Sequence, residues 1–572
     1  MSENNITETT TEPAEASPAV KPSWQEKQGL PKHLGLFFLG GFILSFAVDF
    51  LFWQKPFGYS YAIWVGLILV VSLLLALKEK QEVHHESIFL IAALIATTLA
   101  AVGRMETGTR VYNVLASLVL IGLTCDTLIS GGALRLRVLD TIVRFVLMVF
   151  AVFERPLQAI IAFGDRKKRK EHSHTWKTVV APILRGVVIA LPLLLIFSAL
   201  FASADPVFEQ AMANFFEWLK IEDWGEFLWR GFYILVLGIL FAGALLHALS
   251  GKRNYTPDTQ KPFINPFLGK IETFTIMGLI EVLFAVFVFI QFRYFFGGDT
   301  NINPAGYTFA EYARKGVNEL IAVAILSLIL YQILHIITKT PEKRDKLIMH
   351  VLMTVLFGLV LIMLFSSYQR VDLYQQAYGF SQIRMRTYIF IGWLAALISL
   401  VVVMEWLNEH RRFFAVLTFI SLGFILSQAA VNIDKTIVVR NLERLEDTSL
   451  PAWAAEGLDH QYLSQLSDDA VPAMLKAADD EEEDYKYNQL IPEMLYAELY
   501  CRREYLSEVY AEELPWFSRS PSQDRAWNLL KDRDDLLHED STLQYDSRYS
   551  GDVILLSNGD EHFCNQYWER WD

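Results

Sequence analysis

The sequence has few cysteines, few charged residues and none of the short motifs that mark common enzyme sites. Only three cysteines occur, Cys125, Cys501 and Cys564, and no Cys-x-x-Cys or Cys/His ligand spacing accompanies them. Nucleophile elbows, glycine-rich phosphate loops and His-rich zinc helices are also missing. We therefore expect a protein that is not an enzyme and that needs no metal and no cofactor.

Charged residues make up 20% of the 572 residues, against roughly 25% in an ordinary soluble chain, and apolar residues make up 53%. Apolar runs long enough to cross a bilayer recur from Leu34 to Ala430 and then stop. The pattern predicts an all-α, polytopic membrane helix bundle, with a lipid bilayer as its first partner, followed by a small helical domain outside the membrane.

We expect a disordered N-terminal arm at 1–33, a transmembrane helical domain at 34–430 and an acidic, mainly helical C-terminal domain at 431–572. Eleven spans are predicted within the transmembrane domain. They lie near 34–54, 59–77, 86–104, 111–130, 178–202, 229–249, 272–292, 316–338, 348–366, 387–406 and 412–430.

Lys and Arg accumulate in cytoplasmic loops, and a cytoplasmic N-terminus places about 25 of them inside and about 11 outside. This bias predicts an inner-membrane protein with an external C-terminal domain. The apolar stretch 140–164 has basic flanks on both sides and contains Pro156, so we interpret it as an interfacial or re-entrant segment. If it crossed the membrane instead, there would be twelve spans and the C-terminal domain would be cytoplasmic.

The segment 431–572 holds about 32 acidic and about 13 basic residues, which argues against a nucleic-acid partner. Helices are predicted near 459–466, from 467 with Pro472 in the first turns, near 485–510 and near 522–538. The remainder, 541–572, is predicted to be irregular.

Five spaced segments form a recognisable set. They are Phe289–Gly298, Tyr307–Gly316, Tyr374–Gly379 with Arg384, Arg440–Arg444 and Tyr462–Pro472. In this order they resemble bacterial multi-pass membrane proteins of domain-of-unknown-function family 4173, which is related to family 4153. The resemblance covers roughly residues 35–530 and implies no particular activity.

Glu281 is an ionisable residue inside a predicted span, where a charge must have a partner or a function. It is either a proton or cation site or a structural hydrogen-bonding group, with Arg185 as one candidate partner. A second candidate set lies in the external loops and would form a basic and aromatic pocket for an anionic lipid headgroup or a polymer phosphate. The alternative is that these residues anchor helix ends at the interface. The set comprises Tyr307, Glu311, Tyr312, Arg314, Arg370, Asp372, Tyr374, Tyr378, Arg384 and Arg386.

His247, His335 and His350 lie near cytoplasmic helix ends but in different loops. His172 and His174 lie in a basic loop, where we expect solvated residues rather than metal ligands. An external domain would meet oxidising conditions, which favours a disulfide between Cys501 and Cys564. Two separately buried thiols are the alternative.

Two functional hypotheses remain. In the first, a non-catalytic membrane protein uses its external helical domain to engage an envelope protein, an anionic lipid or a polymer. In the second, the protein is a secondary transporter or an ion-coupled channel that uses Glu281 and the outer arginines.

Overall fold

The computed structural model describes the greater part of the chain, with gaps mainly in the N-terminal arm and in several connections. The described residues are 31–132, 138–168, 203–218, 224–249, 266–295, 316–339, 343–446, 460–480, 491–511, 514–537, 542–546, 551–557, 559 and 561–564, with scattered positions between 186 and 201. Within these residues, ten helices are long and apolar enough to cross a membrane. They coincide with ten of the eleven predicted spans, and the remaining one, 178–202, lies mostly outside the described residues.

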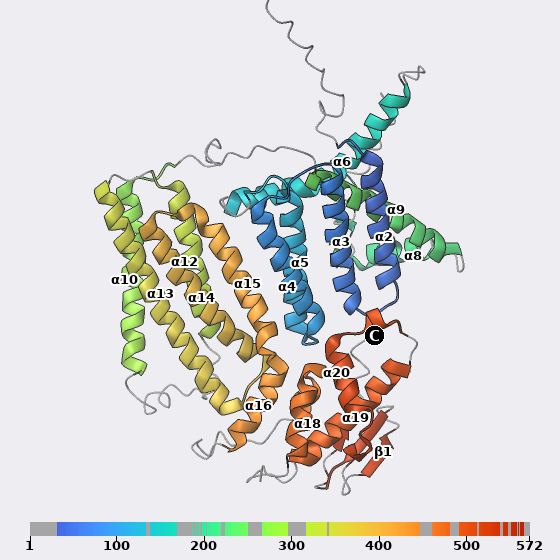
Figure 1. The fold of residues 1–572 in the computed structure, drawn as a ribbon. Coiled ribbons are helices and arrows are strands. Elements are labelled where there is room, and N and C mark those ends of the chain that lie inside the picture. The colour runs from blue at the N-terminus through green and yellow to red at the C-terminus, as the bar shows by residue number, and fades with distance from the viewer. Residues whose placement is uncertain are drawn as a thin grey trace, which may run out of the picture.

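The described helices of the transmembrane domain fall into two groups that lie side by side (Figure 1). The first group contains α2 (Leu34–Phe52), α3 (Tyr59–Lys78), α4 (His85–Gly103), α5 (Thr107–Thr127), α6 (Val138–Lys168), α8 (Pro206–Trp218) and α9 (Trp224–Leu249). The second contains α10 (Lys270–Phe295), α12 (Val317–Ile337), α13 (Lys343–Tyr378), α14 (Gln382–Leu407), η5 (His410–Arg412) and α15 (Phe413–Val431).

Helix α13 forms the centre of the second group. Its residues Met353, Leu356 and Phe357 are fully buried, and α10, α12 and α14 all pack against it. Large apolar side chains such as Leu77 and Phe289 are exposed on the outside of the bundle. This arrangement suits a bilayer, because backbone polar groups are satisfied within helices while apolar side chains face lipid. Helix α15 joins the two groups, since it contacts α14 as well as α4 and α5.

Helix α6 contains the stretch 140–164 and is not among the ten candidate spans. Its residue Arg144 pairs with Asp126 near the end of α5, at 2.8 Å, and Pro156 lies against Gly243 in the last turns of α9. Figure 1 shows α6 lying across this end of the bundle rather than alongside the spans. The position agrees with an interfacial segment, which the basic flanks had predicted.

The C-terminal domain lies at the opposite end of the bundle (Figure 1). Its helices are α16 (Ile433–Glu446), α17 (His460–Ser464), η7 (Asp468–Ala470), α18 (Val471–Asp479), α19 (Ile491–Ala511), η8 (Trp516–Ser518), α20 (Pro521–Leu530) and η9 (Asp534–Leu536). Pro472 stands in the first turn of α18, as predicted. A capping box, Ser520 with Gln523, begins α20.

The expectation of an irregular segment after residue 541 is wrong. Three short antiparallel strands, β1 (Thr542–Asp546), β2 (Gly551–Leu555) and β3 (Glu561–Phe563), form one sheet in the order β1-β2-β3. Ile554 of β2 is fully buried in a small core with residues of α19. A disulfide between Cys501 of α19 and Cys564, directly after β3, ties the sheet to the helices. Such short strands are stable because they pack against a helix.

Candidate functional site

The outer candidate residues divide into a part that the structure describes and a part that it does not. Tyr307, Glu311, Tyr312 and Arg314 lie outside the described residues. The others gather where α13 ends and α14 begins, on the side of the bundle that carries the C-terminal domain (Figure 1). This group comprises Arg370, Asp372, Tyr374, Tyr378, Arg384 and Arg386.

The described outer residues contact one another and nearby backbone. The Arg384 guanidinium lies 4.1 Å from the ring centre of Tyr374 and donates to the Tyr378 carbonyl oxygen at 3.0 Å. The Tyr388 hydroxyl donates to Asp372 Oδ1 at 3.1 Å. These contacts close the turn between α13 and α14, and none of the six residues lines either of the two cavities described below.

Arg386 contacts a different helix. Its guanidinium donates to Glu106, the residue that precedes α5, and Glu106 itself accepts the backbone N–H groups of Gly108 and Thr109. A carboxylate at this position caps the helix and interacts favourably with the positive end of its dipole. Arg386 therefore joins α14 of the second group to α5 of the first.

Glu281 lies on the face of α10 that packs against α13, in line with the fully buried Met277. Its neighbours Leu279 and Val282 are exposed toward the outside of the bundle. Among the described residues, no group lies within hydrogen-bond distance of Glu281 Oε1. The proposed partner Arg185 lies outside the described residues.

A cluster that the sequence interpretation missed surrounds Glu405, near the C-terminal end of α14. His335 Nε2 of α12 lies 3.0 Å and His410 Nδ1 of η5 lies 3.2 Å from Glu405 Oε2. His350 Nδ1 of α13 lies 2.9 Å from Glu405 Oε1. The Tyr331 hydroxyl donates to Oε2 at 3.0 Å. We refer to Glu405, His335, His350 and His410 as the Glu405 cluster.

His335 and His350, which were placed in different loops, therefore meet at Glu405. His172 and His174, which were expected to be solvated, lie outside the described residues. His247 is buried and lies 3.2 Å from Asp126, which also pairs with Arg144. Glu405 offered the one usable signal, because an acidic residue inside an apolar span is expected to have a partner. Sequence spacing could not show that histidines from three separate elements contact Glu405.

The cluster is partly buried, since the His335 and His410 side chains are 25% and 28% exposed. The Glu405 side chain is only 2% exposed, and the His335 and His410 rings lie 3.9 Å apart. Burial, followed by the nearby His335, lowers the pKa of His410 to about 4. At neutral pH the His410 imidazole is thus uncharged.

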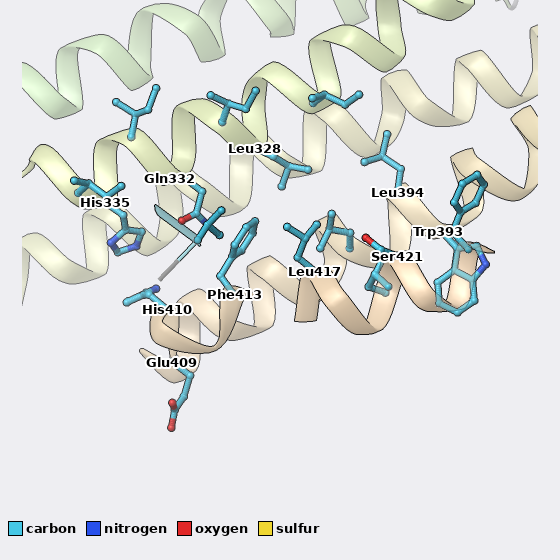
Figure 2. A pocket seen from close by; sticks show the side chains of 18 of the residues that line it. Leu328, Gln332, His335, Trp393, Leu394, Glu409, His410, Phe413, Leu417 and Ser421 are labelled. Carbon is cyan, nitrogen blue, oxygen red and sulfur yellow. The ribbon is translucent and has the colours of Figure 1, made fainter. Parts of the chain in front are cut away.

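An apolar cavity of about 730 Å³ begins at this cluster and runs between α12, α14 and α15. Figure 2 shows His335, Gln332 and His410 together at one end and Trp393 toward the other, with Leu328, Leu417 and Phe413 between them. Asn408 and Glu409 add polar groups near the end that His410 lines. A chamber with apolar walls and a few polar groups at one end is the usual form of a small-molecule site.

A second, polar cavity of about 370 Å³ lies where the C-terminal domain meets the bundle. Glu106 and Arg110 line it from α5 and the preceding turn, and Asp468 and Arg502 line it from the C-terminal domain. Both signs of charge are present in equal number among these four residues. Ion pairs such as Arg502 with Asp468, at 3.3 Å, offset the burial of charge here.

The ten apolar helices, with lipid-facing side chains around them, define a multi-pass membrane protein. A family model described as Domain of unknown function (DUF4153) matches residues 65–477, and the chain belongs to this family. The match supports the relative named in the sequence interpretation, and family 4173 itself is not shown. No curated protein and no solved structure matches the chain.

Proposed function

We propose that this protein is a non-catalytic binding protein of a bacterial cytoplasmic membrane that holds an amphiphilic molecule in the cavity between α12, α14 and α15. The main support for this proposal is the form of the cavity, whose apolar walls end at the Glu405 cluster. Ligand sites commonly occupy about 300–1,000 Å³, so the cavity is large enough for a lipid-like chain or ring system. The polar end suits a headgroup that accepts or donates hydrogen bonds.

The charge bias of the loops supports a cytoplasmic N-terminus and an external C-terminal domain. In Figure 1 the start of α2, near the N-terminus, and the end of α14, which carries the Glu405 cluster, lie at the end of the bundle opposite the C-terminal domain. The headgroup end of the cavity then faces the cytoplasmic leaflet. The ligand would enter from that leaflet.

A matched pair of substitutions on α15 tests the proposal. Leu417 lines the cavity, so Leu417→Trp should fill part of it, whereas Phe419 is exposed on the same helix and Phe419→Trp should leave it open. Purified protein in mild detergent would be analysed by native mass spectrometry and by extraction of bound lipid. We expect wild type and Phe419→Trp to retain an amphiphile that Leu417→Trp has lost. Equal retention by all three, or an empty wild type, would refute the proposal.

Glu281 favours a second candidate function, ion-coupled transport. A buried carboxylate within a span, with no hydrogen-bond partner for Oε1 among the described residues, suits a group that binds and releases a proton or cation. Glu281→Gln should then fold normally but lose the cellular phenotype of the gene, while Glu272→Gln, at an exposed position in the first turn of α10, should keep it. Normal function of Glu281→Gln would remove this candidate.

Engagement of an envelope protein, an anionic lipid or a polymer by the C-terminal domain stays a prediction. Its support is the attachment of the domain to the bundle, which would present one defined surface outside the membrane. Site-specific photo-crosslinking from exposed positions on α19, such as Glu508, in living cells would test it. No crosslinked product from any exposed face of the domain would contradict the prediction.

A further inference from the structure

The Glu405 carboxylate is almost fully buried, and the groups that face it differ from those of an ordinary buried ion pair. Among the described residues, each of its ion-pair contacts comes from a histidine, and no lysine or arginine lies within 4 Å. Another buried carboxylate of this chain, Asp49, has a permanent cation, Arg230, at 2.6 Å. A buried charge needs a compensating cation, and three histidines around one carboxylate are a donor set that can hold a shared metal cation.

The ligand atoms lie at separations that suit a single metal ion. His335 Nε2, His410 Nδ1 and one Glu405 oxygen all lie within 4.8 Å of one another. Zinc binds nitrogen and oxygen ligands at about 2.0–2.2 Å, which places the ligand atoms of a tetrahedral site roughly 3.3 Å apart. The two nitrogens are 3.0 and 3.2 Å from Glu405 Oε2, close to that value.

Two further contacts hold the carboxylate in place. His350 Nδ1 lies 2.9 Å from the other oxygen, Oε1, and the Tyr331 hydroxyl donates to Oε2. Partners of this kind orient the ligands of metal sites and strengthen metal binding. Because the three imidazoles come from α12, α13 and η5, the packing of the second helix group positions the whole set before any ion binds.

We propose that His335 Nε2, His410 Nδ1 and Glu405 Oε2 bind one divalent transition-metal ion of the zinc class, with His350 and Tyr331 as positioning residues. Two imidazoles and one carboxylate form a donor set that suits zinc and leaves one position open. His335 and His410 also line the apolar cavity. The site does not depend on amphiphile binding.

The test uses the full chain, purified in detergent without a polyhistidine tag and stripped with a chelator. Zn²⁺ would be titrated by calorimetry, and Co²⁺ would be added separately to record the visible absorption of a tetrahedral site. We expect one ion per chain. His335→Ala and His410→Ala should each weaken Zn²⁺ binding by roughly tenfold or more. His247→Ala is the matched control, because His247 is a buried histidine that pairs with Asp126 instead.

Each outcome of the titrations either supports or refutes the metal site. Absence of Zn²⁺ binding in wild type, or equal binding by wild type, His335→Ala and His410→Ala, would refute the site. Loss of binding in His247→Ala to the same degree would refute it too, since the effect would then not be local. The Co²⁺ spectrum of wild type tests the geometry without any substitution. If the protein retains an amphiphile but binds no Zn²⁺, the metal site is refuted and the proposed function is not. If it binds Zn²⁺ but retains no amphiphile, the proposed function is refuted and the metal site is not.

Discussion

Asp469 is a central contact between the C-terminal domain and the bundle, and removing its carboxylate should weaken the docking of the domain. The side chain is 1% exposed and accepts the backbone N–H of Met105 at 2.7 Å and that of Glu106 at 3.3 Å. Ser522 Oγ donates to it at 2.8 Å, and Arg104 Nη1 lies at 3.5 Å. One carboxylate thus connects η7 and α20 to the turn between α4 and α5.

Asp469→Ala leaves these donors without an acceptor in a buried junction. A hydrogen bond to a charged group is worth about 1.5–3 kcal/mol, and the bond to Met105 is the shorter of the two backbone bonds. Removing one member of a buried ion pair costs about 3–5 kcal/mol. We therefore expect the docked state to lose about 4 kcal/mol. That loss raises the equilibrium constant for undocking by about three orders of magnitude.

Limited proteolysis of the purified protein measures this equilibrium through the rate at which the C-terminal fragment is released. Glu508→Ala serves as the control, because Glu508 is exposed in the same domain. We expect much faster release from Asp469→Ala and no change in the control. A release rate and melting temperature equal to those of wild type would show that the buried contacts of Asp469 do not hold the domain.

Three further predictions concern packing, the disulfide and pH. Gly41→Ala should lower the free energy of unfolding by about 1–3 kcal/mol, because the new Cβ would meet the α9 backbone. Gly35→Ala is the control, since Gly35 has open space around it. Equal melting temperatures of the two variants would contradict the close packing at Gly41. Cys501→Ser with Cys564→Ser should lower the free energy of unfolding by ~4 kcal/mol for a separation of 63 residues. Labelling of Cys501 and Cys564, in addition to the free Cys125, in the denatured, unreduced wild type would contradict the bridge. Burial raises the pKa of Asp434 to about 6 from 3.8. Between about pH 4 and pH 6 the folded protein therefore keeps a proton on this carboxyl that the unfolded chain loses. The contribution of Asp434 to stability consequently falls as the pH rises through this range. Asp434→Asn should remove that decline from the profile of melting temperature against pH, and an unchanged profile would contradict it.

Local features of the sequence were sufficient for the described membrane helices and for much of the C-terminal domain. A span needs about twenty apolar residues in a row, and this requirement can be read without knowing any neighbour. The basic flanks of 140–164 predicted an interfacial or re-entrant segment, with which the position of α6 across one end of the bundle agrees (Figure 1), and Pro472 predicted a helix start. The strands at 542–563 were missed because each is only three to five residues long and depends on packing against α19.

Tertiary structure alone decided which polar residues meet. Arg386 was expected in an external pocket, yet it pairs with Glu106, 280 residues away, because the two helix groups pack together at that point. Glu405 and His335 are 70 residues apart, and Glu405 and His350 are 55 apart. Hydropathy sets which segments enter the membrane, since it is a property of each segment by itself. The rotation and contact of one helix against another depend on all the side chains between them, so only the folded bundle brings three histidines to one buried carboxylate.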